Sequence, residues 1–97
     1  EFGRRTYENA GLGTDHGRGT CAFVLGGGVH GGRVVTKWPG LPQDDSAVDD
    51  EDRPNGLRVT LDYRDLLWEA LAQQFGAKDS QAVFPGLRHA PPGVFKP

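Results

Sequence analysis

The sequence has 97 residues, of which 15 are glycine and 7 are proline. This length excludes two domains, and glycine and proline together equal leucine, valine and phenylalanine in number, which leaves little apolar material for a free-standing core. A net charge of −2 gives no electrostatic reason to expect nucleic acid or an anionic membrane as the partner. We therefore expect residues 1–97 to be a partial domain that the missing N-terminal part of the same domain completes, and the lack of any methionine supports this expectation.

Signals for export, membrane insertion and disulfide bonding are weak. The single cysteine, Cys21, excludes an internal disulfide. No apolar run approaches the roughly 18 residues of a membrane span. Arg4 and Arg5 are not followed by an apolar stretch, so they do not form a twin-arginine export signal.

The N-terminal part of the chain predicts a loop followed by two short strands. Residues 3–19 contain five glycines and no alternating apolar pattern, which is typical of a long irregular loop, and such loops are usually functional. Residues 20–25 are almost continuously apolar and predict a strand buried on both faces. Residues 26–32 then predict a glycine turn, and residues 33–36 a second short strand.

The acidic residues concentrate in one segment, residues 41–56, which holds six Asp and Glu side chains. Their mutual repulsion predicts a solvated loop. A calcium loop is the alternative, but the spaced oxygen ligands, central glycine and final glutamate of an EF-hand are missing.

One clear helix is predicted over residues 62–75. Asp62 can cap its start together with Asp65, three residues later, and Gly76 is the expected stop. A four-residue spacing predicts its buried side. That side consists of Tyr63, Leu67, Leu71 and Phe75. The proline-rich residues that follow are expected to lie over the surface of the larger domain.

The sharpest chemical feature is the adjacent pair Asp15 and His16 on a glycine-flanked loop. A carboxylate and an imidazole there can both turn toward one divalent cation. The simpler interpretation is an Asx turn made by Asp15 beside an exposed His16. Two ligands also do not complete a site, because zinc needs three or four protein ligands. Further ligands within the chain could come only from Glu1, two other histidines or the acidic segment.

Two other patterns are less consistent with a site. Residues 26–31 formally match GxGxxG, but a dinucleotide site needs a helix directly after that motif, and the following residues favour extended chain. Cys21 with His16 as its base could form a nucleophile pair. The place of Cys21 in the apolar run predicts instead a buried, unreactive thiol.

Five short motifs occur along the chain in a fixed order, and their combination is more specific than any one of them. They are EFGR at residues 1–4, TDHG at 14–17, GGxxxGG at 26–32, WPGL at 38–41 and DYRD at 62–65. In this order the chain resembles the C-terminal part of the bacterial domain-of-unknown-function family 1501, over residues 1 to about 87.

Such proteins are similar to the alkaline phosphatase and sulfatase superfamily. The resemblance implies an α/β fold, with this chain as the C-terminal fragment of an α/β/α sandwich. It also implies an exported, periplasmic protein with a divalent metal ion, whose identity the sequence does not give. Two registers are open for the metal ligands: Asp15 and His16 form the superfamily's Asp-His pair, or Glu1 takes the place of that pair and His16 supplies a later ligand.

The resemblance implies two alternative functions. In the first, the full-length protein is a metal-dependent hydrolase of a small phosphate or sulfate ester, with His16, Asp15 and Glu1 as metal ligands and Arg18 or Arg4 neutralising the ester oxyanion. In the second, the same fold serves as a non-catalytic exported binding or structural module. The superfamily's Ser or Thr nucleophile is absent here, so we expect the 97 residues alone to be inactive.

Overall fold

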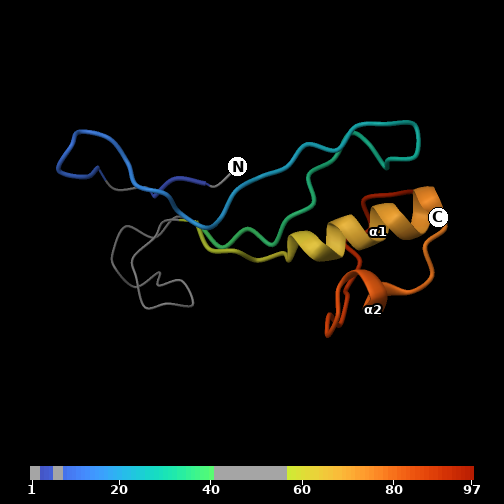
Figure 1. Ribbon diagram of the computed structural model, residues 1–97. Coiled ribbons are helices and arrows are strands. Elements are labelled where there is room, and N and C mark those ends of the chain that lie inside the picture. Colours follow the sequence, from blue (N-terminus) through green and yellow to red (C-terminus); the bar gives the residue numbers. More distant parts are fainter. Residues whose placement is uncertain (1–2, 6–7, 41–56) are drawn as a thin grey trace. The chain divides into compact units, whose positions relative to one another are not determined.

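The computed structural model describes residues 3–5, 8–40 and 57–97. Within these ranges the regular secondary structure is helical (Figure 1), with α1 at Tyr63–Phe75 and α2 at Ser80–Val83. Neither of these two helices has the length and apolar character that crossing a membrane requires.

The chain divides into two compact units. The first unit consists of Glu1–Ala22 and Lys37–Thr60, and the second consists of Phe23–Thr36 and Leu61–Pro97. The loop predicted over residues 41–56 lies outside the described residues. Each unit is described by itself below.

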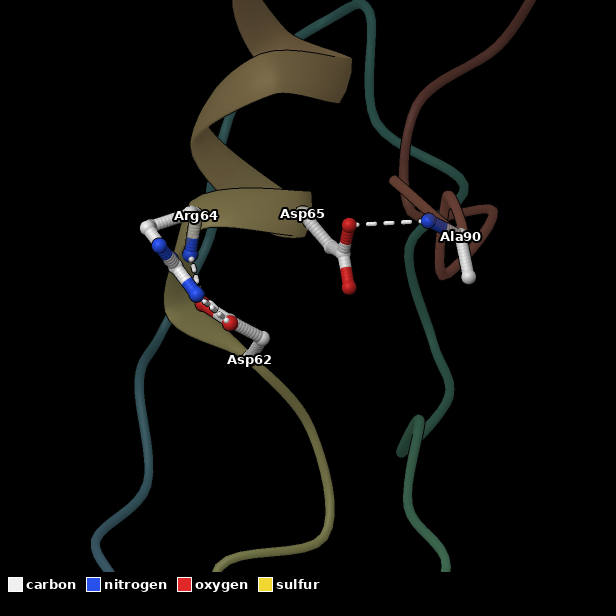
Figure 2. A network of polar contacts seen from close by, with 4 residues as sticks. All are labelled: Asp62, Arg64, Asp65 and Ala90. Carbon is white, nitrogen blue, oxygen red and sulfur yellow. Dashed lines mark hydrogen bonds and ion pairs between the residues drawn. The ribbon is translucent and has the colours of Figure 1, made fainter. Parts of the chain in front are cut away.

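Helix α1 begins at an aspartate cap (Figure 2). Asp62 has extended backbone angles, and its Oδ1 accepts a hydrogen bond from the backbone N–H of Arg64 at 2.9 Å. The Arg64 guanidinium also contacts this carboxylate, with Nη2 2.6 Å from Oδ2. The side-chain hydrogen bond from Arg64 is the main reason that the pKa of Asp62 lies below its usual value. The predicted cap is thus confirmed.

The predicted partner of this cap does something else. Asp65 does not close a capping box, because its Oδ1 accepts a hydrogen bond from the backbone N–H of Ala90 at 2.8 Å (Figure 2). The first turn of α1 therefore binds a segment 25 residues further along the chain.

Helix α1 ends where the sequence predicts. Gly76 adopts the left-handed conformation, with φ of 68°, which a residue with a side chain adopts only with strain. The carbonyl of Leu71 accepts from the N–H groups of Gly76 and Ala77. These two bonds fold the chain after Phe75 back onto the last turn of the helix, as is common at a left-handed glycine stop.

The predicted buried side of α1 is largely exposed in the described chain, although Leu71 on it is half-buried. Tyr63 and Phe75 are 70% and 80% exposed, whereas the buried residues of α1 are Trp68 and Glu69. The four-residue spacing is correct for a helix, but a helix buries only the side that another segment covers. The C-terminal segment covers the side that carries Asp65 and Glu69, because these carboxylates bind its backbone.

Three consecutive backbone N–H groups bind the carboxylate of Glu69. Oε2 accepts from Gly93 at 3.0 Å and from Val94 at 3.1 Å, and Oε1 accepts from Phe95 at 3.0 Å. Glu69 is only 5% exposed, and a buried carboxylate must be hydrogen-bonded to be tolerated. The ring of Trp68, its neighbour, contacts that of His89 in a tilted arrangement, with ring centroids 5.7 Å apart.

The C-terminal segment, residues 90–96, also pairs with the glycine turn of the same unit. An isolated antiparallel bridge joins Val29 to Phe95. His30 donates its N–H to the carbonyl of Val94 at 2.9 Å, and Lys96 donates to that of Gly28 at 2.8 Å. The second unit is therefore built on α1, the C-terminal segment and the glycine turn.

Helix α2 is a single turn with its own cap. Asp79 Oδ1 accepts from the N–H groups of Gln81 and Ala82 at 3.0 and 3.1 Å. The amide of Gln81 then holds the following turn, donating to the carbonyl of Leu87 at 2.9 Å and accepting from Gly86 at 2.8 Å. Leu87 is one of two buried apolar residues in the described ranges, the other being Trp68.

The two predicted strands do not form ladders within the described residues. Residues 20–25 and 33–36 have no strand pairing, and Phe23, Leu25 and Val34 are more than 85% exposed. The predicted burial is wrong for this structure, because a strand is stable only beside partner strands. The glycine turn between them is confirmed by the hydrogen bond from the N–H of Val29 to the carbonyl of Gly26 at 3.1 Å.

The structure also bears on two other sequence patterns, the GxGxxG match and Cys21. No helix begins in residues 26–32, so the helix required by a dinucleotide site is missing from the described turn. Cys21 is exposed rather than buried, which corrects the prediction that its thiol lies in a strand core. The cause is the same lack of a partner strand.

Candidate functional site

The loop that carries Asp15 and His16 is closed by a short antiparallel pairing. Arg5 donates its N–H to the carbonyl of Asp15 at 3.0 Å, and Gly17 donates to that of Gly3 at 2.7 Å. These bonds flank a bridge between Arg4 and His16. In such a pair the two residues lie directly opposite each other with their side chains on the same face.

Two arginines tie the loop further. Arg4 Nη1 donates to the carbonyl of Thr14 at 2.8 Å, and Arg5 Nε donates to that of His16 at 3.1 Å. The Arg4 guanidinium has other N–H groups, so this bond does not exhaust its capacity to bind an anion.

The turn of the loop is organised by Asn9. Its Oδ1 accepts from the backbone N–H groups of Gly11 at 2.9 Å and Gly13 at 3.1 Å, and its own N–H donates to the carbonyl of Gly13 at 2.8 Å. The bond to Gly11, two residues on, is that of an Asx turn. Leu12 takes a positive φ of 61° within this turn.

The sequence interpretation placed the Asx turn at the wrong residue. It assigned that role to Asp15, whereas Asn9 performs it. An asparagine followed within four residues by two glycines was the available signal, because asparagine favours Asx turns and glycine accepts the backbone angles of tight turns.

The base of the loop requires glycine at a close contact. A Cβ added to Gly3 would overlap the carbonyl oxygen of Gly19, and one added to Gly19, which is buried, would lie 2.5 Å from the carbonyl oxygen of Leu57. The residues after the acidic segment thus pack directly against the loop of the first unit.

Asp15 is exposed and held from one side only. Its Oδ1 accepts from Asn9 Nδ2 at 3.0 Å. Within the described residues its Oδ2 accepts no hydrogen bond. Asp15 can therefore offer one carboxylate oxygen to a ligand.

His16 is also exposed, but the pairing directs it away from Asp15. Successive residues of a paired extended segment point to opposite faces, so the structure brings His16 together with Arg4 and Asp15 together with Asn9. It does not bring the Asp15 carboxylate and the His16 imidazole together. This geometry is less consistent with the register in which the adjacent pair shares one cation.

The remaining predicted site residues are placed as follows. Arg18 is exposed in the first unit, and Glu1 lies outside the described residues. His30 and His89 belong to the second unit. In the described part of the chain, no three His, Cys, Asp or Glu residues are grouped as a metal site. The donor types of Asp15 and His16 suit a divalent cation, but their number does not suffice.

Comparison with known proteins identifies the family. A search of curated proteins and a search of solved structures each returned no match. The family model described as "Protein of unknown function (DUF1501)" matches residues 1–87. Because this match spans most of the 97 residues, the chain belongs to the DUF1501 family.

Proposed function

We propose that the full-length protein is an exported, metal-dependent hydrolase of a small phosphate or sulfate ester. The proposal rests first on the resemblance of the ordered motifs to the alkaline phosphatase and sulfatase superfamily. The structural observation that supports it is the exposed loop that carries both Asp15 and His16, on which one Asp15 carboxylate oxygen accepts no hydrogen bond within the described residues.

The ligand set requires residues beyond the described loop. His16, Asp15 and Glu1 are the proposed contributors from this chain, and the remaining ligands and the nucleophile come from the N-terminal part of the domain. A bound divalent cation would polarise the ester and favour its attack. The α/β/α sandwich is proposed on the same resemblance.

The basic residues of the loop supply the anion contacts. Arg18 and Arg4 are exposed in the same unit as His16, and guanidinium groups bind phosphate or sulfate oxygens through paired hydrogen bonds. Arg4 lies opposite His16 in the bridge, so a substrate anion bound there would lie close to the imidazole.

The second candidate is a non-catalytic exported binding or structural module. The observation that favours it is that the described residues bring together no set of three metal ligands. It predicts neither bound metal nor ester hydrolysis in the full-length protein.

Metal analysis of the purified full-length protein, combined with hydrolysis of phosphate and sulfate esters before and after chelation, separates the two candidates. The hydrolase proposal predicts a bound divalent metal and an activity that chelation removes and metal restores. A protein that contains no metal, binds none when it is supplied and hydrolyses no ester would leave the binding or structural module.

A further inference from the structure

We propose that Asn9 is the positioning residue of the Asp15 loop and that its amide has two separable roles. The oxygen folds the turn at residues 10–13, and the nitrogen holds the Asp15 carboxylate. This inference rests on the proposed function for its chemical purpose, but the two roles are tested below without it.

The first role follows from the hydrogen bonds of Oδ1. This single atom accepts from the N–H groups of Gly11 and Gly13, at 2.9 and 3.1 Å. No other hydrogen bond is found for these two N–H groups within the described residues, so the Asn9 oxygen is their acceptor, while the backbone bonds from Asn9 to Gly13 and from Leu12 to Asn9 close the turn beside it. Alanine at this position would leave both donors to water.

The second role follows from Nδ2, which donates to Asp15 Oδ1 at 3.0 Å. Because Asn9 is half-buried and Asp15 is exposed, the carboxylate is held against the loop at its inner oxygen. Its Oδ2 is then the oxygen available to a ligand. Under the proposed function, Asp15 would therefore offer Oδ2 to the cation while Asn9 holds Oδ1.

Two substitutions separate these roles. Asn9→Ser keeps a side-chain oxygen that can accept from the N–H two residues on, as in ST turns, but it lacks the amide donor to Asp15. Asn9→Ala removes both. Gln81→Ala is the control, because it removes an amide that likewise donates to and accepts from other parts of the chain, once each, but in the second unit.

The test uses NMR and Zn²⁺ titration of the full-length protein. We expect Asn9→Ala to raise the solvent-exchange rates of the Gly11 and Gly13 amides about fivefold, and Asn9→Ser to raise them less. Both variants should shift the carboxyl ¹³C signal of Asp15 and weaken Zn²⁺ binding about 10- to 100-fold. Gln81→Ala should change none of these quantities.

The outcomes are distinct for the two proposals. Unchanged glycine exchange in Asn9→Ala, or an unchanged Asp15 signal in both variants, would overturn the assignment of Asn9. A wild-type protein that binds no Zn²⁺ would instead contradict the metal site, and the exchange rates and the Asp15 signal would still decide the role of Asn9.

Discussion

At the scale of single residues, one polar side chain in each unit binds several backbone N–H groups of an irregular segment. Asn9 fixes the loop of the first unit, and Glu69 fixes the C-terminal segment of the second. In both cases the partners are backbone N–H groups. A hydrogen bond of this kind stabilises by about 1 kcal/mol, and one to a charged acceptor such as Glu69 by about 1.5–3 kcal/mol.

Replacing Glu69 by alanine is expected to destabilise the second unit by about 1–3 kcal/mol, because three backbone donors, none of them fully buried, lose a charged acceptor. Chemical denaturation measures the loss of stability, and hydrogen exchange at residues 93–95 locates it. Glu8→Ala, an exposed acidic position in the first unit, is the control and should be neutral. Equal stability of the two variants would show that Glu69 does not hold the segment.

The role of Glu69 could not be predicted from the sequence. The donors that it binds are backbone groups, and every residue except proline carries one. No residue type therefore marks the segment 93–95 as a carboxylate-binding turn. The spacing of Asp65 and Glu69 places both on one side of a helix, but it does not indicate what covers that side.

At the scale of elements, local signals predicted the helix correctly and failed for the strands. The start and end of α1 depend on Asp62 and Gly76, whose effects act within a few residues. A strand depends on a partner that is distant in the sequence. Residues 20–25 and 33–36 have strand-like composition, but the described chain offers them no partner.

The Asp62 cap makes the stability of α1 dependent on pH. Because the hydrogen bond from Arg64 lowers the folded-state pKa of Asp62, its contribution is complete above the unfolded pKa of about 3.9. This contribution is lost as the pH falls through the lower folded-state value. Asp62→Ala should cost about 1 kcal/mol at pH 7 and progressively less in acid.

Asp62→Asn is the matched control for this prediction, since asparagine keeps the capping oxygen but does not titrate. Circular dichroism of thermal unfolding between pH 7 and pH 2 compares the three proteins. The difference between wild type and Asp62→Asn should shrink toward low pH. A difference that stays constant across this range would mean that the ion pair with Arg64 contributes nothing.

At the scale of the whole molecule, the second unit exposes much apolar surface. Phe23, Leu25 and Val34 are exposed, as are Tyr63 and Phe75 of α1. A soluble domain rarely leaves so many large apolar side chains in water. This exposure supports the proposal that the N-terminal part of the same domain covers them.

Leu71 tests that proposal. It is half-buried in the described chain, on the helix side that carries the exposed Tyr63 and Phe75. In the full-length protein Leu71→Ala should cost about 2–5 kcal/mol, as for a buried leucine, and in the 97-residue chain clearly less. Chemical denaturation measures the free energy of unfolding of wild type and Leu71→Ala in each of the two lengths. Gln73→Ala, on the exposed surface, is the control. An equal loss of stability in the full-length and the 97-residue proteins would contradict the proposal that the rest of the domain covers Leu71.

The candidate site was predictable only in part. Asp15 and His16 are adjacent in sequence, but their side chains point to opposite sides of the loop. The glycine-flanked loop could be predicted from composition. The pairing that opposes His16 to Arg4 could not, since it depends on which residues of a loop meet across the turn. Asp15 and His16 thus lie on one loop, as expected, without their side chains converging.

The central claim, that this loop contributes to a metal site, is tested most directly by bound metal per chain in the full-length wild type, His16→Ala and Asp15→Asn. We predict one or more divalent ions in the wild type and a loss of at least about 10-fold in affinity for His16→Ala; Asp15→Asn should cost as much if Asp15 is a ligand, and less if it only orients His16. Full metal occupancy and unaltered ester hydrolysis in His16→Ala would contradict the account and leave the loop with a structural role.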